Sequence, residues 1–344
     1  MNNLEYLKKK GFCAFSCLLI VTQAVGCTSR TTFSKSNPSD SHSTAVVSSD
    51  SSKSSSDSNL IAGNVSTSSS KTSTCKDARI LDDVTCQPQD KQTIEQILRE
   101  ASLLQDKPKS WMLWFGKKFM GVPYVAGTLD AAKDERLVIN TTQLDCTTYV
   151  EMVVALTRCA ENKKYTFADY CEQLKHVRYI GGEVAYEKRQ HYFTAWINDN
   201  VEEGIVTDIK TNPPFTAVQH ISVNWMTTHQ SSYKMLNGNA ARLKGIKALE
   251  NSINGKSYRY IPKSTIANNS LFRKTILDGD IIVIITNKKG LDTTHIGIAS
   301  WHSDGLHLLN ASSIHKKVID EPLTLKTYMS KHPSQIGIRV CRVR

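Results

Sequence analysis

Three residues of this sequence have side chains that together suit the cleavage of an amide bond. Cys146 opens a segment with helical spacing, His295 opens a β-like run much later in the chain, and Asn310 lies in the next such run. A thiol nucleophile needs an imidazole to take its proton, and the imidazole needs a third polar group that holds its orientation. Adjacent strands would place His295 and Asn310 side by side. The order Cys, His, Asn therefore predicts a thiol-dependent hydrolase.

Cys146 is expected in the first turn of a helix. The residues that follow it have the one-faced spacing of an amphipathic helix: Tyr149, Val150, Val153, Val154 and Thr157. Either Asp145 caps this helix, or Thr148 and Glu151 form a capping box one turn later. Backbone N–H groups and the helix dipole then favour the thiolate, while the charge of Asp145 opposes it. A lone cysteine here is more often a core residue, so the prediction depends on its two partners.

Length and charge limit the class of protein. The chain has 344 residues, of which 40% are hydrophobic, enough for one large core or two small ones. Its formal net charge of +11 favours anionic surroundings such as cell wall, lipopolysaccharide or nucleic acid. No block of Lys and Arg is interleaved with aromatic residues, so we expect no nucleic-acid partner.

Residues 1–26 are predicted to be a secretory signal peptide. Three lysines at positions 8–10 precede an apolar run at 13–21 that is too short for a membrane span. The segment ends in Ala-Val-Gly-Cys, which resembles the bacterial lipobox, although Ala24 replaces the usual Leu. We therefore expect lipidation of Cys27, with Thr28 favouring the outer membrane on its periplasmic side. Ordinary cleavage that leaves Cys27 free is the alternative.

Residues 27–90 are predicted to be a lipidated cysteine followed by a flexible tether. Serine accounts for 19 of the 47 residues from Thr28 to Thr74, and such a composition buries too little apolar surface to fold. A low-complexity insertion without a role has the same composition. Cys75 and Cys86 either close a small disulfide loop or stay reduced. The other cysteines, at 159, 171 and 341, show no metal-binding or redox spacing.

Residues 91–344 are predicted to form an α+β domain, with helices first and a sheet last. Helical periodicity covers 94–104, 111–119, 146–157 and 167–176, with a further possible helix at 240–249. Short β-rich runs at 281–285, 294–299, 306–312 and 336–340 indicate an antiparallel meander. The aromatic segment 191–200 is interpreted as core packing from its spacing alone. Residues 201–260 give little signal.

Several separated motifs give the chain a family resemblance. They are Gly121-Val122-Pro123-Tyr124 with Gly127, Leu144-Asp145-Cys146-Thr147-Thr148 with Glu151, His191-Tyr192-Phe193 with Trp196, Leu291 to Gly297, and Asn310-Ala311-Ser312-Ser313. Together they resemble the NlpC-type papain-like cell-wall hydrolases, and within them the N-acetylmuramoyl-L-alanine amidase-like family. The resemblance covers roughly Gln92 to Arg344.

The resemblance implies roles for individual residues. Cys146 is the implied nucleophile, His295 the general base and then acid, and Asn310 the third member, where the family often has His. Asn accepts a hydrogen bond from the imidazole but carries no charge, so it polarises the histidine less. Tyr124 is implied to line the site near the nucleophile. The implied substrate pocket is formed by His191, Tyr192 and Trp196.

The implied reaction is hydrolysis of the amide between N-acetylmuramic acid and L-alanine in muropeptides, the soluble fragments of peptidoglycan. It needs no metal or other cofactor, and the sequence lacks the His-Glu-x-x-His run of zinc amidases. Two alternatives remain: an NlpC-type endopeptidase that cuts within the stem peptide, and a non-catalytic lipoprotein that binds peptidoglycan. The sequence does not indicate the oligomeric state, the preferred sugar form or the preferred stem length.

Overall fold

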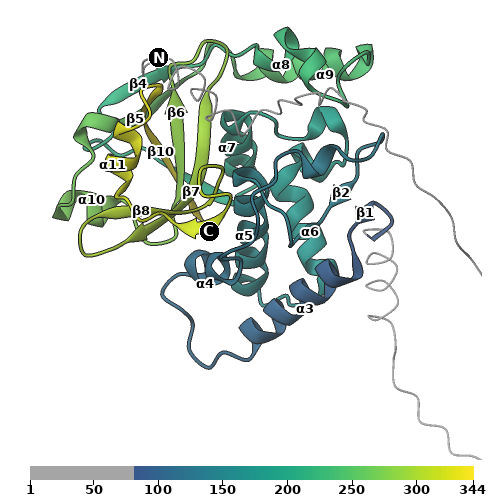
Figure 1. Cartoon of the computed structure of the whole chain (residues 1–344), viewed down its shortest axis with the longest axis horizontal. Helices are drawn as coiled ribbons and strands as arrows, with labels where there is room; N and C mark the ends of the chain where they lie inside the picture. The colour runs from purple at the N-terminus through teal and green to yellow at the C-terminus, as the bar shows by residue number, and fades with distance from the viewer. Residues whose placement is uncertain (1–80) are drawn as a thin grey trace, which may run out of the picture.

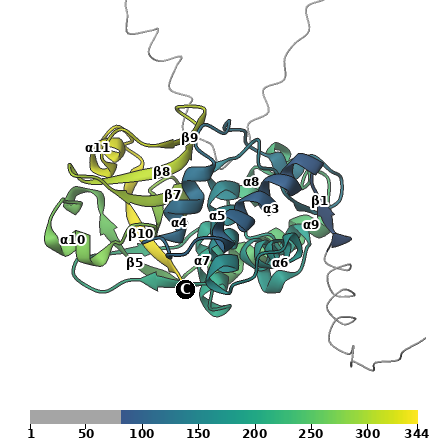
Figure 2. The ribbon, with the colours of Figure 1, turned by 90° about the horizontal axis from the view of Figure 1, so that it is seen from below.

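A computed structural model describes residues 81–344 and shows helices packed on an antiparallel sheet, as the α+β prediction required (Figures 1 and 2). The helices are α3 (Pro88–Ser102), α4 (Trp111–Lys118), α5 (Cys146–Glu161), α6 (Phe167–Arg178), α7 (Phe193–Glu202), α8 (Trp225–Thr228), α9 (Ala240–Ile253), α10 (Ser270–Thr275) and α11 (Leu325–Ser330). The strands are β1 (Val84–Thr85), β2 (Leu137–Val138), β3 (Val206–Ile209), β4 (Ala217–His220), β5 (Ser257–Pro262), β6 (Ile281–Thr286), β7 (Thr293–Trp301), β8 (Leu306–Ser312), β9 (Lys317–Asp320) and β10 (Gln335–Val343).

The large sheet has the strand order β4-β5-β10-β6-β7-β8-β9, and β3 also pairs with β10. Strands β6 to β9 form the meander that the sequence predicted. The prediction of a sheet built only from the end of the chain was wrong, because β3, β4 and β5 come from the region that was hard to read. Strand β10 runs back between β5 and β6, so it lies inside the sheet.

Apolar cores cover both faces of this sheet. Every residue of β6 is buried, and successive side chains point to opposite faces. Ile281 and Val283 belong to the core formed with the helical layer of α3 to α7, whereas Ile282 and Ile284 belong to the core beneath α10 and α11. In Figure 1 these two short helices lie on the side of the sheet away from α5. Burial on both faces explains the continuous apolar run in this strand.

The same alternation in β7 separates its residues between the two faces. Ile296 and Ile298 belong to the core with α5. His295 faces α11 instead, with its ring centroid 6.3 Å from that of Tyr328. Gly297 follows on the same face, where an added Cβ would lie 2.9 Å from the Cβ of Asn310. The strand therefore needs glycine here so that Asn310 can approach closely.

Helix α5 lies at the centre of the helical layer, between the sheet and α6 (Figure 1). All but three of its 16 residues are buried, among them Cys146, Tyr149 and Val153. The sequence predicted a helix with a single buried stripe. The helix is buried on nearly all sides because α3, α4, α6 and the sheet all pack against it.

The middle of the chain forms a smaller third core. It joins α7 to α8 and α9, and its members include Tyr186, Tyr192, Met226, Leu236 and Ile246. The aromatic segment that starts at His191 mostly forms helix α7. Its interpretation as core packing holds for most of its apolar side chains, which are buried.

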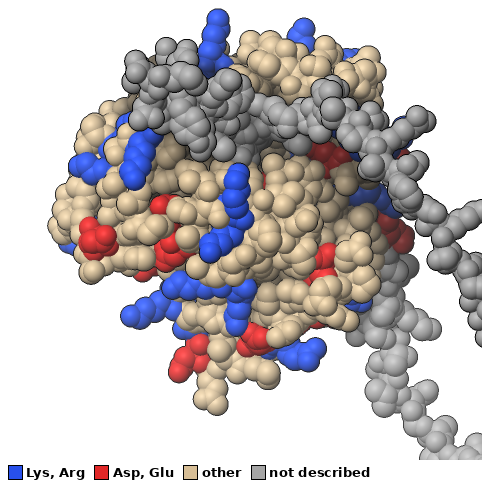
Figure 3. All heavy atoms as spheres, in the orientation of Figure 1, with Lys and Arg blue, Asp and Glu red and all other residues tan. Residues whose placement is uncertain are grey.

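None of the helices described within residues 81–344 is long and apolar enough to cross a membrane. On the face shown in Figure 3, Lys and Arg side chains are scattered over several elements and do not form one continuous stripe. The predicted signal peptide, the lipidation site at Cys27, most of the tether and Cys75 lie outside the described residues.

Candidate active site

Cys146 is the first residue of α5, as predicted. Asp145 is the N-cap: its carboxylate Oδ1 accepts the backbone N–H of Thr148 at 2.8 Å, and the Thr148 hydroxyl accepts the N–H of Asp145 at 3.0 Å. This reciprocal pair settles the helix boundary, and Glu151 takes no part in it. Burial raises the pKa of Asp145, while its bonds to Thr148 act against that rise. The cap therefore satisfies the backbone N–H of Thr148 in the first turn of the helix. The side chain of Cys146 is fully buried.

His295 and Asn310 form the pair that the sequence predicted on adjacent strands. The Asn310 amide nitrogen donates to the Leu308 carbonyl at 2.8 Å, so the amide oxygen faces the imidazole. Nε2 of His295 lies 2.9 Å from that oxygen and must donate its hydrogen to it. This bond fixes the tautomer of His295 and leaves Nδ1 with the lone pair. A neutral amide thus orients the imidazole without adding charge.

His295 is buried in a way that keeps its imidazole neutral. Burial lowers its pKa to about 4, the bond to Asn310 works in the opposite direction, and the nearby His332 lowers it further. A neutral imidazole can accept a proton from a thiol at neutral pH. The geometry therefore suits a base that acts during the attack.

Tyr328 of α11 lies near both Cys146 and His295. Its ring is 6.3 Å from that of His295, centroid to centroid. Burial raises its pKa to about 12, the bond to Gln335 acts against that rise, and the charges of Glu321 and Cys146 add to it. Nothing in the sequence around Tyr328 indicated a site, because α11 is short and reaches β7 only in the folded chain. Tyr328 is therefore a site residue that sequence reasoning missed.

An open cleft lies against the start of α5 and the start of β7. Its volume is about 850 Å³, including space open to solvent. Its walls come from the loop at 126–130, the first turns of α5, the segment 189–193, Tyr233 and β7. The residues on either side of Cys146, and Thr293 and Ile296 beside His295, line it. The cleft is thus bounded by the neighbours of the two predicted reactive residues.

Buried ion pairs stiffen the wall of this cleft. The Arg178 Nε atom is 2.6 Å from Oε2 of Glu151, and both side chains are 3% exposed. Nη1 of the same guanidinium donates to the Val138 carbonyl at 2.7 Å. Similarly, Arg189 is 2.6 Å from the Asp130 carboxylate. These pairs join residues distant in sequence, so no local pattern could have indicated them.

Tyr124 and His191 are two further residues that the sequence predicted in the site. The backbone of Tyr124 forms a parallel bridge with Leu144, two residues before the predicted nucleophile. His191 lines the cleft, and its Nε2 donates to the Tyr186 carbonyl at 2.7 Å. Burial and the guanidinium of Arg189 lower the pKa of His191 well below its usual range.

Tyr192 and Trp196, which we also expected in the pocket, do not line the cleft. The Tyr192 hydroxyl donates to the Glu250 carboxylate at 2.7 Å, inside the third core. Trp196 is completely buried and stacks on Phe193 with centroids 4.7 Å apart. Tyr192 is the N-cap of α7 and Trp196 lies on the helix, and the two side chains are buried in different cores. They support the cleft wall from within and do not offer a surface to substrate.

Comparison with known proteins gives one family match. The family described as N-acetylmuramoyl-L-alanine amidase-like matches residues 114–338. Among solved structures, an N-acetylmuramoyl-L-alanine amidase from Bacteroides uniformis is 36% identical, with a TM-score of 0.63, and the match covers 68% of this chain and 97% of that one. A putative xylanase from Bacteroides fragilis is 34% identical, with a TM-score of 0.63, over 67% of this chain and 100% of that one.

A more distant structure shares only the fold. This protein from Legionella pneumophila is 22% identical, with a TM-score of 0.58, over 78% of this chain and 96% of that one. A search of curated proteins found no match.

The buried pair of Glu151 and Arg178 gives a stability prediction. Arg178→Met leaves a buried carboxylate without its counter-charge and should lower the free energy of unfolding by about 3 to 5 kcal/mol. The double variant Glu151→Leu/Arg178→Met should recover much of that loss. Urea denaturation of the purified protein measures both. The control is Lys107→Met, which breaks an exposed pair with Glu161 (2.7 Å) and should cost no more than about 1 kcal/mol. Equal losses in the two single variants would contradict the prediction.

The lowered pKa of His295 predicts a pH-dependent stability. Above pH 6.5 the imidazole is neutral in the folded and the unfolded protein. Between pH 6.5 and about 4 only the unfolded chain binds the proton, so the free energy of unfolding decreases as the pH is lowered through this window. From pH 7 to pH 5 the wild type should lose about 2 kcal/mol more than His295→Gln. Urea midpoints at the two pH values test this. Parallel losses in the two proteins would show that His295 does not titrate as described.

Proposed function

Because the chain belongs to the N-acetylmuramoyl-L-alanine amidase-like family, we propose that it hydrolyses the amide bond between N-acetylmuramic acid and L-alanine in peptidoglycan fragments, with Cys146 as nucleophile. Family membership indicates an amidase-type hydrolase whose substrate is peptidoglycan. The observation that carries the finer proposal is the hydrogen bond of 2.9 Å between His295 and Asn310. This bond orients the imidazole of His295, so that Nδ1, which can accept a proton, has a defined position.

The first half of the reaction forms a thioester. The sulfur of Cys146 attacks the carbonyl carbon of the lactoyl group, and its proton passes to Nδ1 of His295. The positive end of the α5 dipole stabilises the negative charge that develops on the carbonyl oxygen. The carbon–nitrogen bond then breaks, and His295 returns the proton to the departing amine of L-alanine. The Asn310 oxygen holds the imidazole through both transfers.

The second half of the reaction restores the enzyme. His295, neutral again, takes a proton from water, and the hydroxide attacks the thioester carbonyl. The carbon–sulfur bond breaks, the proton passes from His295 to the sulfur of Cys146, and N-acetylmuramic acid leaves, after which its carboxyl group loses a proton to solvent. Tyr328 closes the site on the side of α11, where it limits access of bulk water to the imidazole.

We propose a papain-like, NlpC-type arrangement for the fold. The nucleophile at a helix start and the base on an antiparallel strand support it. His295 faces α11, and we propose that the thiol and the imidazole approach each other at the end of the sheet where α5 and β7 both begin. The Tyr328 side chain, near both groups, supports that meeting point.

The cleft offers polar groups for a sugar and a short peptide. His191, Arg189 and Asp130 lie along its wall, and Tyr233 adds an aromatic side chain. Such a mixture of stacking surface and a few fixed polar groups suits the muramoyl end of a muropeptide.

Carboxylates in the cleft do not favour the glycoside chemistry that the name of the Bacteroides fragilis neighbour suggests. Glycosidases need two carboxyl groups that flank the scissile bond, one as acid and the other as base or nucleophile. Here Glu151 is paired with Arg178, Asp130 is paired with Arg189, and Asp145 caps α5. Each carboxylate is occupied in holding the structure, so an amide substrate is the better match.

We further propose that lipidated Cys27 holds the domain at the outer membrane, on its periplasmic side, through the serine-rich tether. Cells fed a fatty acid that carries an alkyne tag should label the wild-type protein. The Cys27→Ser variant should lose the label entirely, because the thioether that carries the lipid cannot form. An unlabelled wild type, in a host that labels its other lipoproteins, would argue for ordinary cleavage.

Mass spectrometry of the products tests the bond that is cut. Purified protein with N-acetylmuramoyl-tripeptide should release N-acetylmuramic acid and a tripeptide that begins with L-alanine. Cys146→Ala and His295→Gln should each lower kcat by at least about a thousandfold. Cys171→Ala, which removes a buried thiol from α6, is the matched control and should keep its activity.

Other products would assign the other functions. Muramoyl-dipeptide with a single released diamino acid would identify a stem-peptide endopeptidase. Binding of the substrate without any cleavage would identify a peptidoglycan-binding protein. Full activity in Cys146→Ala would remove the thiol mechanism in either case.

A further inference from the structure

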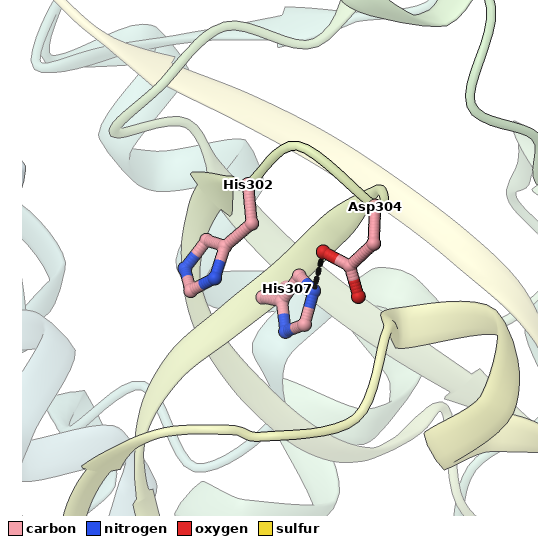
Figure 4. A group of neighbouring side chains, drawn as sticks. All are labelled: His302, Asp304 and His307. Carbon is pink, nitrogen blue, oxygen red and sulfur yellow. Dashed lines mark hydrogen bonds and ion pairs between the residues drawn. The ribbon is translucent and has the colours of Figure 1, made fainter.

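A cluster of two histidines and an aspartate lies at the turn between β7 and β8, outside the proposed active site (Figure 4). His302, Asp304 and His307 each point one potential ligand atom toward the others, all within 4.8 Å of one another. His307 is buried, whereas His302 and Asp304 are exposed to solvent. The turn is at the end of these strands opposite to His295 and Asn310. The proposed amidase mechanism uses none of the three.

Hydrogen bonds on the far side of each ring fix which nitrogen can bind a ligand. Nδ1 of His307 lies 2.7 Å from the backbone carbonyl of Glu321 and must donate to it, so Nε2 keeps its lone pair. Nε2 of His302 lies 3.1 Å from the Asp320 carboxylate. Nε2 therefore donates its hydrogen to this carboxylate, and Nδ1 keeps the lone pair that can bind a ligand. Histidine ligands of metals usually have such an acceptor on their second nitrogen, which orients the ring.

The free side of His307 faces a negative charge. Its Nε2 is 2.9 Å from Oδ1 of Asp304. With Nδ1 already donating, a lone pair and a carboxylate oxygen meet at this distance, and they repel unless a positive charge lies between them. The ring of His302 stacks on that of His307 with centroids 4.0 Å apart and an angle of 15° between the rings. A second nitrogen donor is therefore close by, and the exposed His302 ring must rotate for its lone pair to face the same ion.

Contacts from outside the cluster hold the turn in this shape. The His302 backbone N–H donates to the Gly305 carbonyl at 2.9 Å, which closes the loop. Arg273 of α10 donates to the His302 carbonyl at 2.8 Å and stacks over Trp301. Asn268 donates to the Ser303 carbonyl at 3.2 Å. The backbone of the turn is thus held in place before any ion binds.

The geometry points to a binding site for a divalent transition-metal ion of the zinc class at His302, Asp304 and His307. Two neutral imidazoles and one carboxylate are ligands that Zn²⁺ accepts, with water in the remaining position. Bound metal would tie the end of β7 to the start of β8. It would thereby stiffen the hairpin whose other end carries His295 and Asn310, and it takes no part in the thiol chemistry. A shared proton between His307 and Asp304 is the competing occupant.

Calorimetric titration with Zn²⁺ tests the site. The full chain is purified without a polyhistidine tag, stripped with EDTA, and carries Cys146→Ala so that the predicted nucleophile cannot bind metal. One tight equivalent per chain is expected. His302→Ala and Asp304→Asn change exposed residues and should each weaken binding by at least about tenfold. His229→Ala, which removes an exposed histidine stacked on Trp225, is the matched control and should bind like its parent.

Substitution of Co²⁺ for Zn²⁺ identifies the ligand type. Visible absorption without a thiolate charge-transfer band is expected, because the proposed ligands are nitrogen and oxygen. Three results would overturn the site: no tight equivalent, equal weakening in His229→Ala, or a thiolate band that persists in His302→Ala. Failure of the amidase assay would leave these binding results unchanged, so the two proposals can be judged separately.

Discussion

The ion pair between Glu151 and Arg178 holds the helix on which the proposed nucleophile lies. Both charges are almost completely shielded from water, where an unpaired partner is costly. Arg178 also bonds the Val138 carbonyl, so one guanidinium connects α5, the end of α6 and β2. Apolar packing alone would allow α5 to slide or rotate slightly, whereas a directional charge contact does not. The position of Cys146 relative to α6 and β2 therefore depends on an interaction more than one helical turn away.

A similar division between polar orientation and apolar packing is found across the sheet. Asn310 fixes one nitrogen of His295, and its own amide is fixed by the Leu308 carbonyl. Gly297 leaves room for the side chains of Leu308 and Asn310, which an added Cβ would crowd. At the far end of the same two strands, backbone and carboxylate acceptors orient His302 and His307 in the same manner. One hairpin thus carries oriented imidazoles at both ends. In each imidazole a hydrogen bond to one ring nitrogen determines that the second nitrogen keeps the lone pair.

The sequence alone could predict what depends on near neighbours. The start of α5 at Cys146 follows from the cap residue and the apolar spacing, and β6 to β8 follow from short apolar runs bounded by turn residues. Strands β3 to β5 could not be predicted with the same means, because many of their residues are partly exposed. Strands β3 and β5 pair with the distant β10, and β4 pairs with β5. Tyr328 and Arg178 were missed because their roles arise from contacts between distant segments.

The aromatic segment after His191 shows why a residue type is weaker evidence than its spacing. A family resemblance suggested a pocket made of Tyr192 and Trp196, while helical spacing suggested a core. The interpretation as core packing was the better guide, since Tyr192 is buried in the third core and Trp196 in the core of the helical layer. His191 lies just before them in the chain and lines the cleft.

The interior position of β10 sets an order for folding. This strand is the last element of the chain, yet it separates β5 from β6 and also pairs with β3. Strands β3, β5 and β6 are synthesised before β10, and each lacks part of its hydrogen bonding until β10 pairs with it. Long-range pairing of this kind is slow. The helical layer can therefore begin to collapse during synthesis, but the hairpin with His295 and Asn310 gains its full support only when residues 335–343 have emerged, so an unfinished chain should not be active.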